Sequence, residues 1–240
     1  MSAFFSVTGV AKRFRGLVAV DRASFQVTRG EIFAVIGPNG AGKTTLFNMI
    51  AGALKPDEGA VAFQGECIEG LRPDEVCRRG IARTFQIVRP FPALTVEDNI
   101  MIGALLRTSD TAQAQEKAHE VMRQLDLFDK RGRIAKSLTL PDRKRLEVAR
   151  ALATTPELLL LDEVMAGLRP TETDRIVAIL RELNRQGLTI LLIEHVMRAV
   201  MALANRVLVL HHGAPIALGA PADVVREAAV ISSYLGAEAI

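Results

Sequence analysis

Tryptophan is absent from this 240-residue sequence, aromatic residues make up only 5% of it, and cysteine occurs twice. Cys67 and Cys77 are too few for a disulfide framework, and their spacing is not that of a metal site. Apolar runs such as residues 158–161 and 189–193 are much shorter than the roughly 20 residues that span a membrane. The first residues lack the basic and apolar regions of a signal peptide. We therefore expect no membrane span and a cytoplasmic location.

No sign of charge dominates either, because 30 lysine and arginine residues are balanced by 27 acidic residues. This mixture permits a nucleic-acid partner but does not argue for one, and we expect none. The hydrophobic fraction of 49% excludes a disordered chain, and the length is sufficient for one large α/β domain with a sizeable core.

The sequence alternates between strand-like and helix-like stretches. Uninterrupted apolar runs predict buried strands of a parallel sheet, at residues 32–36, 158–161, 188–193 and 206–210. Shorter strand patterns predict a side sheet, at residues 4–10, 23–27 and 61–63. Helical periodicity predicts amphipathic helices at residues 170–186 and around 118–125, the latter capped by Ser109 or Asp110.

These patterns predict a single α/β domain over residues 1–240, in which a parallel-sheet core carries an antiparallel side sheet. The core is expected to comprise residues 1–88 and 151–215. Residues 89–150, where strand patterns are missing, are expected to form an inserted helical subdomain.

The strongest motif follows the apolar run at residues 32–36 and opens a helix, which is the context that a phosphate-binding loop G-x-x-x-x-G-K-[ST] requires. Backbone N–H groups of such a loop and of the helix N-terminus bind phosphate oxygens. Lys43 is expected to reach the β- and γ-phosphates and Thr44 to bind magnesium. The predicted loop residues are Gly37, Pro38, Asn39, Gly40, Ala41, Gly42, Lys43, Thr44 and Thr45.

A second motif follows the apolar run at residues 158–161, where Asp162 and Glu163 stand at the carboxyl end of the strand. Ligands of parallel sheets gather at this edge. Alone, the motif could be an ordinary strand entering a turn. With a phosphate loop upstream, we expect Asp162 to hold hydrated magnesium and Glu163 to polarise the attacking water.

Two further polar residues are expected at the same edge. His195 follows the strand at residues 188–193 and could bind the γ-phosphate, and Gln86 could contact magnesium or water. Taken alone, each could equally be a structural or solvated residue. We expect the other histidines to lie on the surface or in packing positions: His119, His211 and His212.

The order of these motifs resembles that of the ATP-binding cassette of ABC transporters over nearly the whole sequence. The resemblance implies a P-loop NTPase (RecA-like) fold, ATP hydrolysis, and ATP and Mg²⁺ as ligands. It also implies that Gln86 is the Q-loop glutamine, Glu163 the catalytic carboxylate and His195 the switch histidine. Phe14 corresponds to the aromatic residue that stacks on adenine, although it could also be a partly exposed strand end.

A narrower resemblance, to the ATPase subunits of branched-chain amino acid importers, rests on residues 80–99, 166–170, 193–197 and 213–236. It implies a C-terminal helical tail over residues 216–240. It also implies that cassette dimerisation drives uptake of branched-chain or related amino acids or small polar solutes. The implied partners are membrane permease subunits, a second ATPase subunit and, indirectly, a periplasmic or extracellular substrate-binding protein. The implied location is the inner face of the cell membrane, through the permease.

The signature segment departs from the family pattern LSGGQ, because it reads Leu138, Thr139, Leu140, Pro141 and Asp142. Pro141 lacks the backbone N–H that a glycine would direct at phosphate. We expect the charge of Asp142 to oppose binding of a polyanion. As a helix start the segment is favourable, with Thr139 as the cap and Pro141 in the first turn.

In this family, ATP lies between the phosphate loop of one cassette and the signature of another. We therefore expect a heterodimer in which this chain's own site hydrolyses ATP and its altered signature makes the second site poorer; a homodimer is the alternative. Two other readings stay open. One is a cassette of a lipopolysaccharide-export system, and the other is a mainly nucleotide-binding subunit with low turnover.

Overall fold

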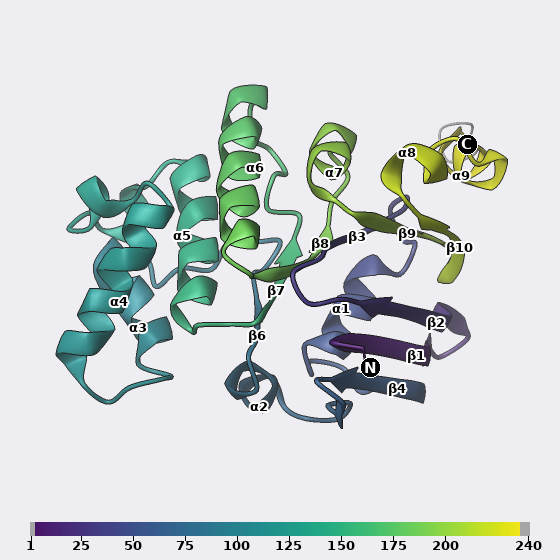
Figure 1. Cartoon of the computed structure of the whole chain (residues 1–240), viewed down its shortest axis with the longest axis horizontal. Helices are drawn as coiled ribbons and strands as arrows, with labels where there is room; N and C mark the ends of the chain where they lie inside the picture. The colour runs from purple at the N-terminus through teal and green to yellow at the C-terminus, as the bar shows by residue number, and fades with distance from the viewer. Residues whose placement is uncertain (1–2, 236–240) are drawn as a thin grey trace.

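The computed structural model describes residues 3–235 and contains two sheets (Figure 1). In the six-stranded sheet, all neighbouring strands are parallel except the first pair. Its order is β10 (Ala214–Gly219), β9 (Arg206–His211), β3 (Ile32–Ile36), β8 (Thr189–Ile193), β7 (Leu158–Asp162) and β6 (Ile81–Arg83). The four-stranded sheet is antiparallel, in the order β2 (Leu17–Val27), β1 (Phe5–Phe14), β4 (Glu58–Phe63) and β5 (Glu66–Cys67).

The central strands β3, β7 and β8 are buried at every residue, which explains their uninterrupted apolar sequences. Because side chains alternate across a strand, the two faces of the sheet contribute to different cores. Leu159 and Leu161 belong to a core shared with the helices, whereas Leu158 and Leu160 belong to a core shared with the antiparallel sheet and the following helix.

Nine α-helices and two short 3₁₀ helices surround the sheets within residues 3–235. Three of the α-helices lie at one end of the molecule (Figure 1): α3 (Val96–Ala104), α4 (Thr111–Gln124) and α5 (Leu140–Ala153). The 3₁₀ helices η1 (Phe128–Lys130) and η2 (Ala135–Ser137) lie between α4 and α5 in the chain. The other α-helices are α1 (Lys43–Ile50), α2 (Pro73–Arg78), α6 (Pro170–Arg185), α7 (Met197–Leu203), α8 (Pro221–Val224) and α9 (Ala228–Leu235). None of the helices within the described residues has both the length and the apolarity that a membrane span requires.

The fold class predicted from the sequence is confirmed, with local differences. Helix α3 and strand β6 had no recognised pattern, and Asp110 rather than Ser109 caps α4. Residues 216–219, expected in the helical tail, belong to β10, because they continue an antiparallel pairing with β9. Helix begins only at Pro221, and residues 236–240 of the expected tail lie outside the described residues. The division into core, subdomain and tail stays a prediction.

The parallel strands end at a common edge, which positions the candidate site. Asp162 is paired in register with Ile193, so the residues that follow β7 and β8 emerge side by side. Strand β3 is parallel to β8, and Gly37 follows its last residue. Three segments that are distant in the sequence therefore meet at one edge.

Asn99 in α3 is a fully buried amide whose removal should destabilise the subdomain. Its side chain accepts a hydrogen bond from the Phe91 N–H at 2.8 Å and donates to the Thr95 carbonyl at 2.8 Å. In Asn99→Ala the Phe91 N–H loses its acceptor, while the Thr95 carbonyl oxygen keeps the backbone N–H of residue 99. We therefore expect the free energy of unfolding to fall by about 1–3 kcal/mol. Urea unfolding followed by circular dichroism measures this. The exposed Glu116→Ala is the control, and an equal effect of both variants would contradict the prediction.

Candidate functional site

The phosphate-loop sequence forms the connection between β3 and α1. Gly42 caps α1 with a φ of 99°. Among the described residues, no side chain caps this helix N-terminus, so the N–H groups of its first turn face the loop without a side-chain acceptor. A helix N-terminus of this kind binds anions through its N–H groups and its dipole. The loop therefore presents the N–H groups that the predicted phosphate site requires.

Two glycines are required by the space around the loop. A Cβ on Gly37 would lie 2.1 Å from the Leu210 carbonyl oxygen, and one on Gly42 would lie 2.2 Å from the Ala19 carbonyl oxygen. Both glycines also have positive φ. The loop is thus wedged between the β1–β2 hairpin and the end of β9, so glycine at these positions is a packing requirement.

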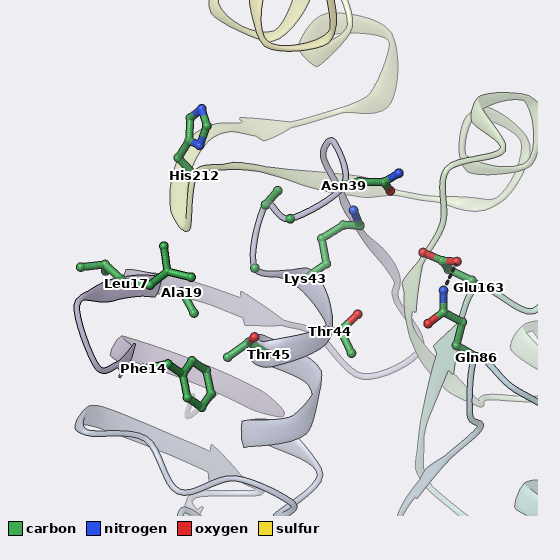
Figure 2. Close-up of a pocket in the computed structure, with 14 residues that line it drawn as sticks. Phe14, Leu17, Ala19, Asn39, Lys43, Thr44, Thr45, Gln86, Glu163 and His212 are labelled. Carbon is green, nitrogen blue, oxygen red and sulfur yellow. Dashed lines mark hydrogen bonds between the residues drawn. The ribbon is translucent and has the colours of Figure 1, made fainter. Parts of the chain in front are cut away.

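Lys43 lies inside the loop at the floor of a pocket of about 400 Å³ (Figure 2). Its Nζ donates hydrogen bonds to the carbonyl oxygens of Gly37 at 2.7 Å and Pro38 at 2.9 Å. Burial lowers the pKa of Lys43, and the nearby carboxylates of Glu163 and Asp162 act in the opposite direction. The ammonium group is therefore held by the backbone at the place where phosphate oxygens would bind.

Asp162 ends β7 and is almost completely buried. Its Oδ2 accepts a hydrogen bond from Arg83 Nη2 at 2.8 Å, whereas its Oδ1 is buried and has no hydrogen-bond partner within the described residues. Burial raises the pKa of Asp162, and Arg83 opposes that shift. Arg83, on the neighbouring strand β6, was not recognised from the sequence; its position three residues before Gln86 was the available signal.

The arrangement fits magnesium bound together with phosphates. Within residues 3–235, no cluster of three or more histidine, cysteine and acidic residues could hold a metal alone. Mg²⁺, however, is commonly bound by one or two protein groups, waters and substrate phosphates. The unpartnered Oδ1 of Asp162 and the hydroxyl of Thr44, which lines the pocket, are suitable oxygen ligands.

Glu163, Gln86 and His195 come together at one end of the pocket. Nε2 of Gln86 donates a hydrogen bond of 2.7 Å to Oε2 of Glu163 (Figure 2). Nδ1 of His195 lies 3.9 Å from the same oxygen, and the histidine side chain is half exposed outside the pocket lining. Gln86 and Glu163 thus line the pocket, and His195 lies beside it.

The opposite end of the pocket is more apolar. Phe14, Leu17 and Ala19 line it together with His212 (Figure 2). Phe14 is 43% exposed and thus accessible to a planar ligand. His212 is exposed on the surface, as expected, and the β9–β10 turn brings it to the pocket, where the Gly213 N–H donates to the Ala41 carbonyl oxygen.

The signature segment begins α5 as predicted, with Thr139 as its cap and Pro141 in the first turn. The expectation for Asp142 needs correction. Its carboxylate is buried and paired with Lys130 and Arg145, so its charge is offset within the chain and is not free to repel phosphate. The Thr139 hydroxyl also donates to Asp142 Oδ2 at 2.9 Å. The Thr139 hydroxyl proton therefore forms a hydrogen bond within the signature segment.

Comparisons with known proteins agree with this geometry. The family model described as ABC transporter matches residues 20–166. The high-affinity branched-chain amino acid transport ATP-binding protein LivG of Salmonella typhimurium is 39% identical over 96% of this chain and 97% of its own length. The lipopolysaccharide export system ATP-binding protein LptB of Acidithiobacillus ferridurans is 34% identical over 98% of both chains. The solved ADP conformation of MJ1267, an ATP-binding cassette of an ABC transporter, superposes with a TM-score of 0.89 at 32% identity, covering 98% of this chain and all of that one.

The pairing of Asp142 predicts a pH-dependent contribution to stability. Burial alone would raise the pKa of Asp142, but the hydrogen bonds from Lys130 and Thr139 and the charges of Lys130 and Arg145 lower it overall. A lowered folded-state pKa stabilises the fold above the unfolded value of about 3.9, and this contribution is lost as the pH falls through the folded value.

We therefore expect Asp142→Asn to lower the free energy of unfolding at neutral pH and to have less effect below about pH 4. Denaturant unfolding at a series of pH values measures the difference from the unsubstituted chain. Asp129→Asn, at an exposed position of η1, is the matched control. A difference that does not change with pH would contradict the assignment.

Proposed function

The chain belongs to the ABC transporter family, and on this premise we propose that it is the ATP-hydrolysing subunit of an importer for branched-chain or related amino acids or small polar solutes. The observation that carries the hydrolytic part is the hydrogen bond between Gln86 and Glu163 at the end of a pocket whose floor is the phosphate loop. The similarity to LivG over nearly the full length of both chains supports the substrate class.

We propose the following roles for the site residues. The N–H groups of the loop from Gly37 to Thr45 and the Lys43 ammonium bind the β- and γ-phosphates, and Phe14 stacks on adenine. Thr44 and Asp162 hold magnesium, with Gln86 beside it, and the metal would neutralise charge on the phosphate oxygens.

In the same proposal, Glu163 accepts a hydrogen bond from the attacking water and increases its nucleophilicity. Gln86 orients that carboxylate through its hydrogen bond to Oε2, so the other oxygen can face the water. His195, which is half exposed beside Glu163, binds the γ-phosphate. These groups converge from three strand ends, so a small shift of one strand end would change the hydrolysis rate.

We further propose that the chain works with a second, different cassette on the inner face of the membrane. The partner signature would complete this chain's own site. The reverse site would be poorer, because Pro141 has no N–H to offer and the Thr139 hydroxyl donates to Asp142. Permease subunits would contact the Gln86 loop and the helical subdomain, and a substrate-binding protein would deliver the solute from the other side.

A lipopolysaccharide-export cassette is the second candidate, supported by the similarity to LptB over 98% of both chains. Both candidates use the same ATP site, so the site residues do not distinguish them. The solute that stimulates ATP hydrolysis by the assembled transporter does. A mainly nucleotide-binding role has less support, because Gln86 and Glu163 are both present and hydrogen-bonded.

The proposal predicts ATP-driven solute uptake that depends on Glu163. In vesicles containing the permease and both cassettes, leucine-loaded binding protein should stimulate Mg²⁺-dependent ATP hydrolysis and leucine uptake. Glu163→Gln should lower ATP hydrolysis and leucine uptake by about 100-fold or more, because no carboxylate then activates the attacking water. ATP binding should persist. Stimulation by lipopolysaccharide instead of leucine would favour the export candidate, and unchanged hydrolysis in Glu163→Gln would contradict the proposed mechanism.

A further inference from the structure

Lys144 on α5 is a buried lysine, 4% exposed, and it lies two residues after the signature segment. Its Nζ donates hydrogen bonds to two backbone carbonyl oxygens, that of Glu163 at 3.0 Å and that of Gln86 at 3.3 Å. One side chain thus joins the signature helix, the residue after β7 and the loop after β6. The two residues that it holds by their backbones are the same two whose side chains meet in the pocket.

Glu163 has an unusual backbone conformation for a non-glycine residue, with a φ of 49°. Such left-handed conformations are costly and persist only where surrounding contacts impose them. Its N–H donates to the Ile193 carbonyl oxygen at 3.0 Å, and its carbonyl oxygen accepts from Lys144. The conformation is therefore held on both sides, on one by the neighbouring strand and on the other by the signature helix.

Two other residues on the same face of α5 contact the Gln86 loop. Nη1 of Arg150 donates to the Arg89 carbonyl oxygen at 2.7 Å. The backbone N–H groups of Phe85 and Arg89 stabilise the charged form of Glu147, although burial raises the pKa of Glu147 overall. Both residues fasten the loop to the helix. Of the three, Lys144 is the one that also bonds to Glu163.

The surroundings of Lys144 make its positive charge hard to replace. Burial lowers the pKa of Lys144, and the carboxylates of Glu194 and Glu163 oppose that shift. Glu194 is fully buried, and its Oε2 has no hydrogen-bond partner within residues 3–235. A neutral side chain at position 144 would leave the Gln86 carbonyl oxygen without its donor and the Glu163 carbonyl oxygen with the Ala166 N–H alone. It would also remove the buried cation from this acidic region.

We propose that Lys144 is a positioning residue for ATP hydrolysis, which holds the backbones of Glu163 and Gln86 so that their side chains meet. Because α5 begins with the signature segment, a shift of that segment against a partner cassette moves Lys144 and, through it, the chain's own Glu163. The residue thus links the state of one ATP site to the geometry of the other. This inference rests on the proposed hydrolytic role of Glu163.

The test compares Lys144→Met, Lys144→Arg and the control Lys117→Met in the complex of both cassettes with the permease. Lys117 pairs with Glu120 on α4 and does not line the ATP pocket. Lys144→Met should lower kcat for Mg²⁺-dependent ATP hydrolysis by about tenfold or more and leave KM within about twofold, because nucleotide binding does not use Lys144. Lys144→Arg should recover most of kcat, since a guanidinium can donate to both carbonyl oxygens.

A second measurement uses the isolated chain and needs no turnover. Amide hydrogen exchange at residues 84–90 and 163–166 should be faster in Lys144→Met than in the unsubstituted chain and should be unchanged in Lys117→Met. An active wild-type complex in which Lys144→Met keeps its kcat, or in which only KM changes, would overturn the inference. If the wild-type complex hydrolyses no ATP, the proposed function fails, and unchanged exchange would then overturn the positioning role separately.

Discussion

The burial of β3, β7 and β8 in one parallel sheet is the constraint on which the site depends. Since all three strands run in the same direction and are apolar throughout, their polar continuations must emerge together at the carboxyl edge. The phosphate loop follows β3, the two carboxylates end β7, and His195 follows β8. The register between β7 and β8 then sets how these groups face one another.

Two buried acidic side chains, Asp162 and Asp142, are paired with cations of the same chain. Arg83 pairs with Asp162 but leaves one carboxylate oxygen for a metal. Lys130 and Arg145 neutralise Asp142, so an acidic residue in the signature segment stabilises the helix start rather than facing solvent. The Thr139 hydroxyl donates a hydrogen bond to the same carboxylate. The altered signature is thus well built as a helix N-terminus and poorly equipped as a phosphate ligand.

Most of the fold and the core of the site could be predicted because their signals are local. The loop from Gly37 to Thr45 stands between its strand and helix, and the two carboxylates end an apolar strand. The contacts of Arg83 with Asp162 and of Lys144 with Glu163 could not be predicted, since they join residues 79 and 19 positions apart and carry no periodic pattern. The place of His212 beside the pocket could not be predicted, because a turn brings it there. The charge of Asp142 was misjudged because its cations come partly from another helix.

We propose that the signature of a different cassette completes this chain's ATP site, because a second copy would offer only a signature committed to internal bonds. The most direct test measures Mg²⁺-dependent ATP hydrolysis by the purified chain over a range of protein concentrations, with and without the second cassette. We expect the chain alone to bind ATP and to hydrolyse it at a low rate per chain at every concentration. Adding the second cassette should increase this hydrolysis rate markedly. A rate per chain that rises with the concentration of the chain alone would contradict it, because two copies would then complete each other's sites.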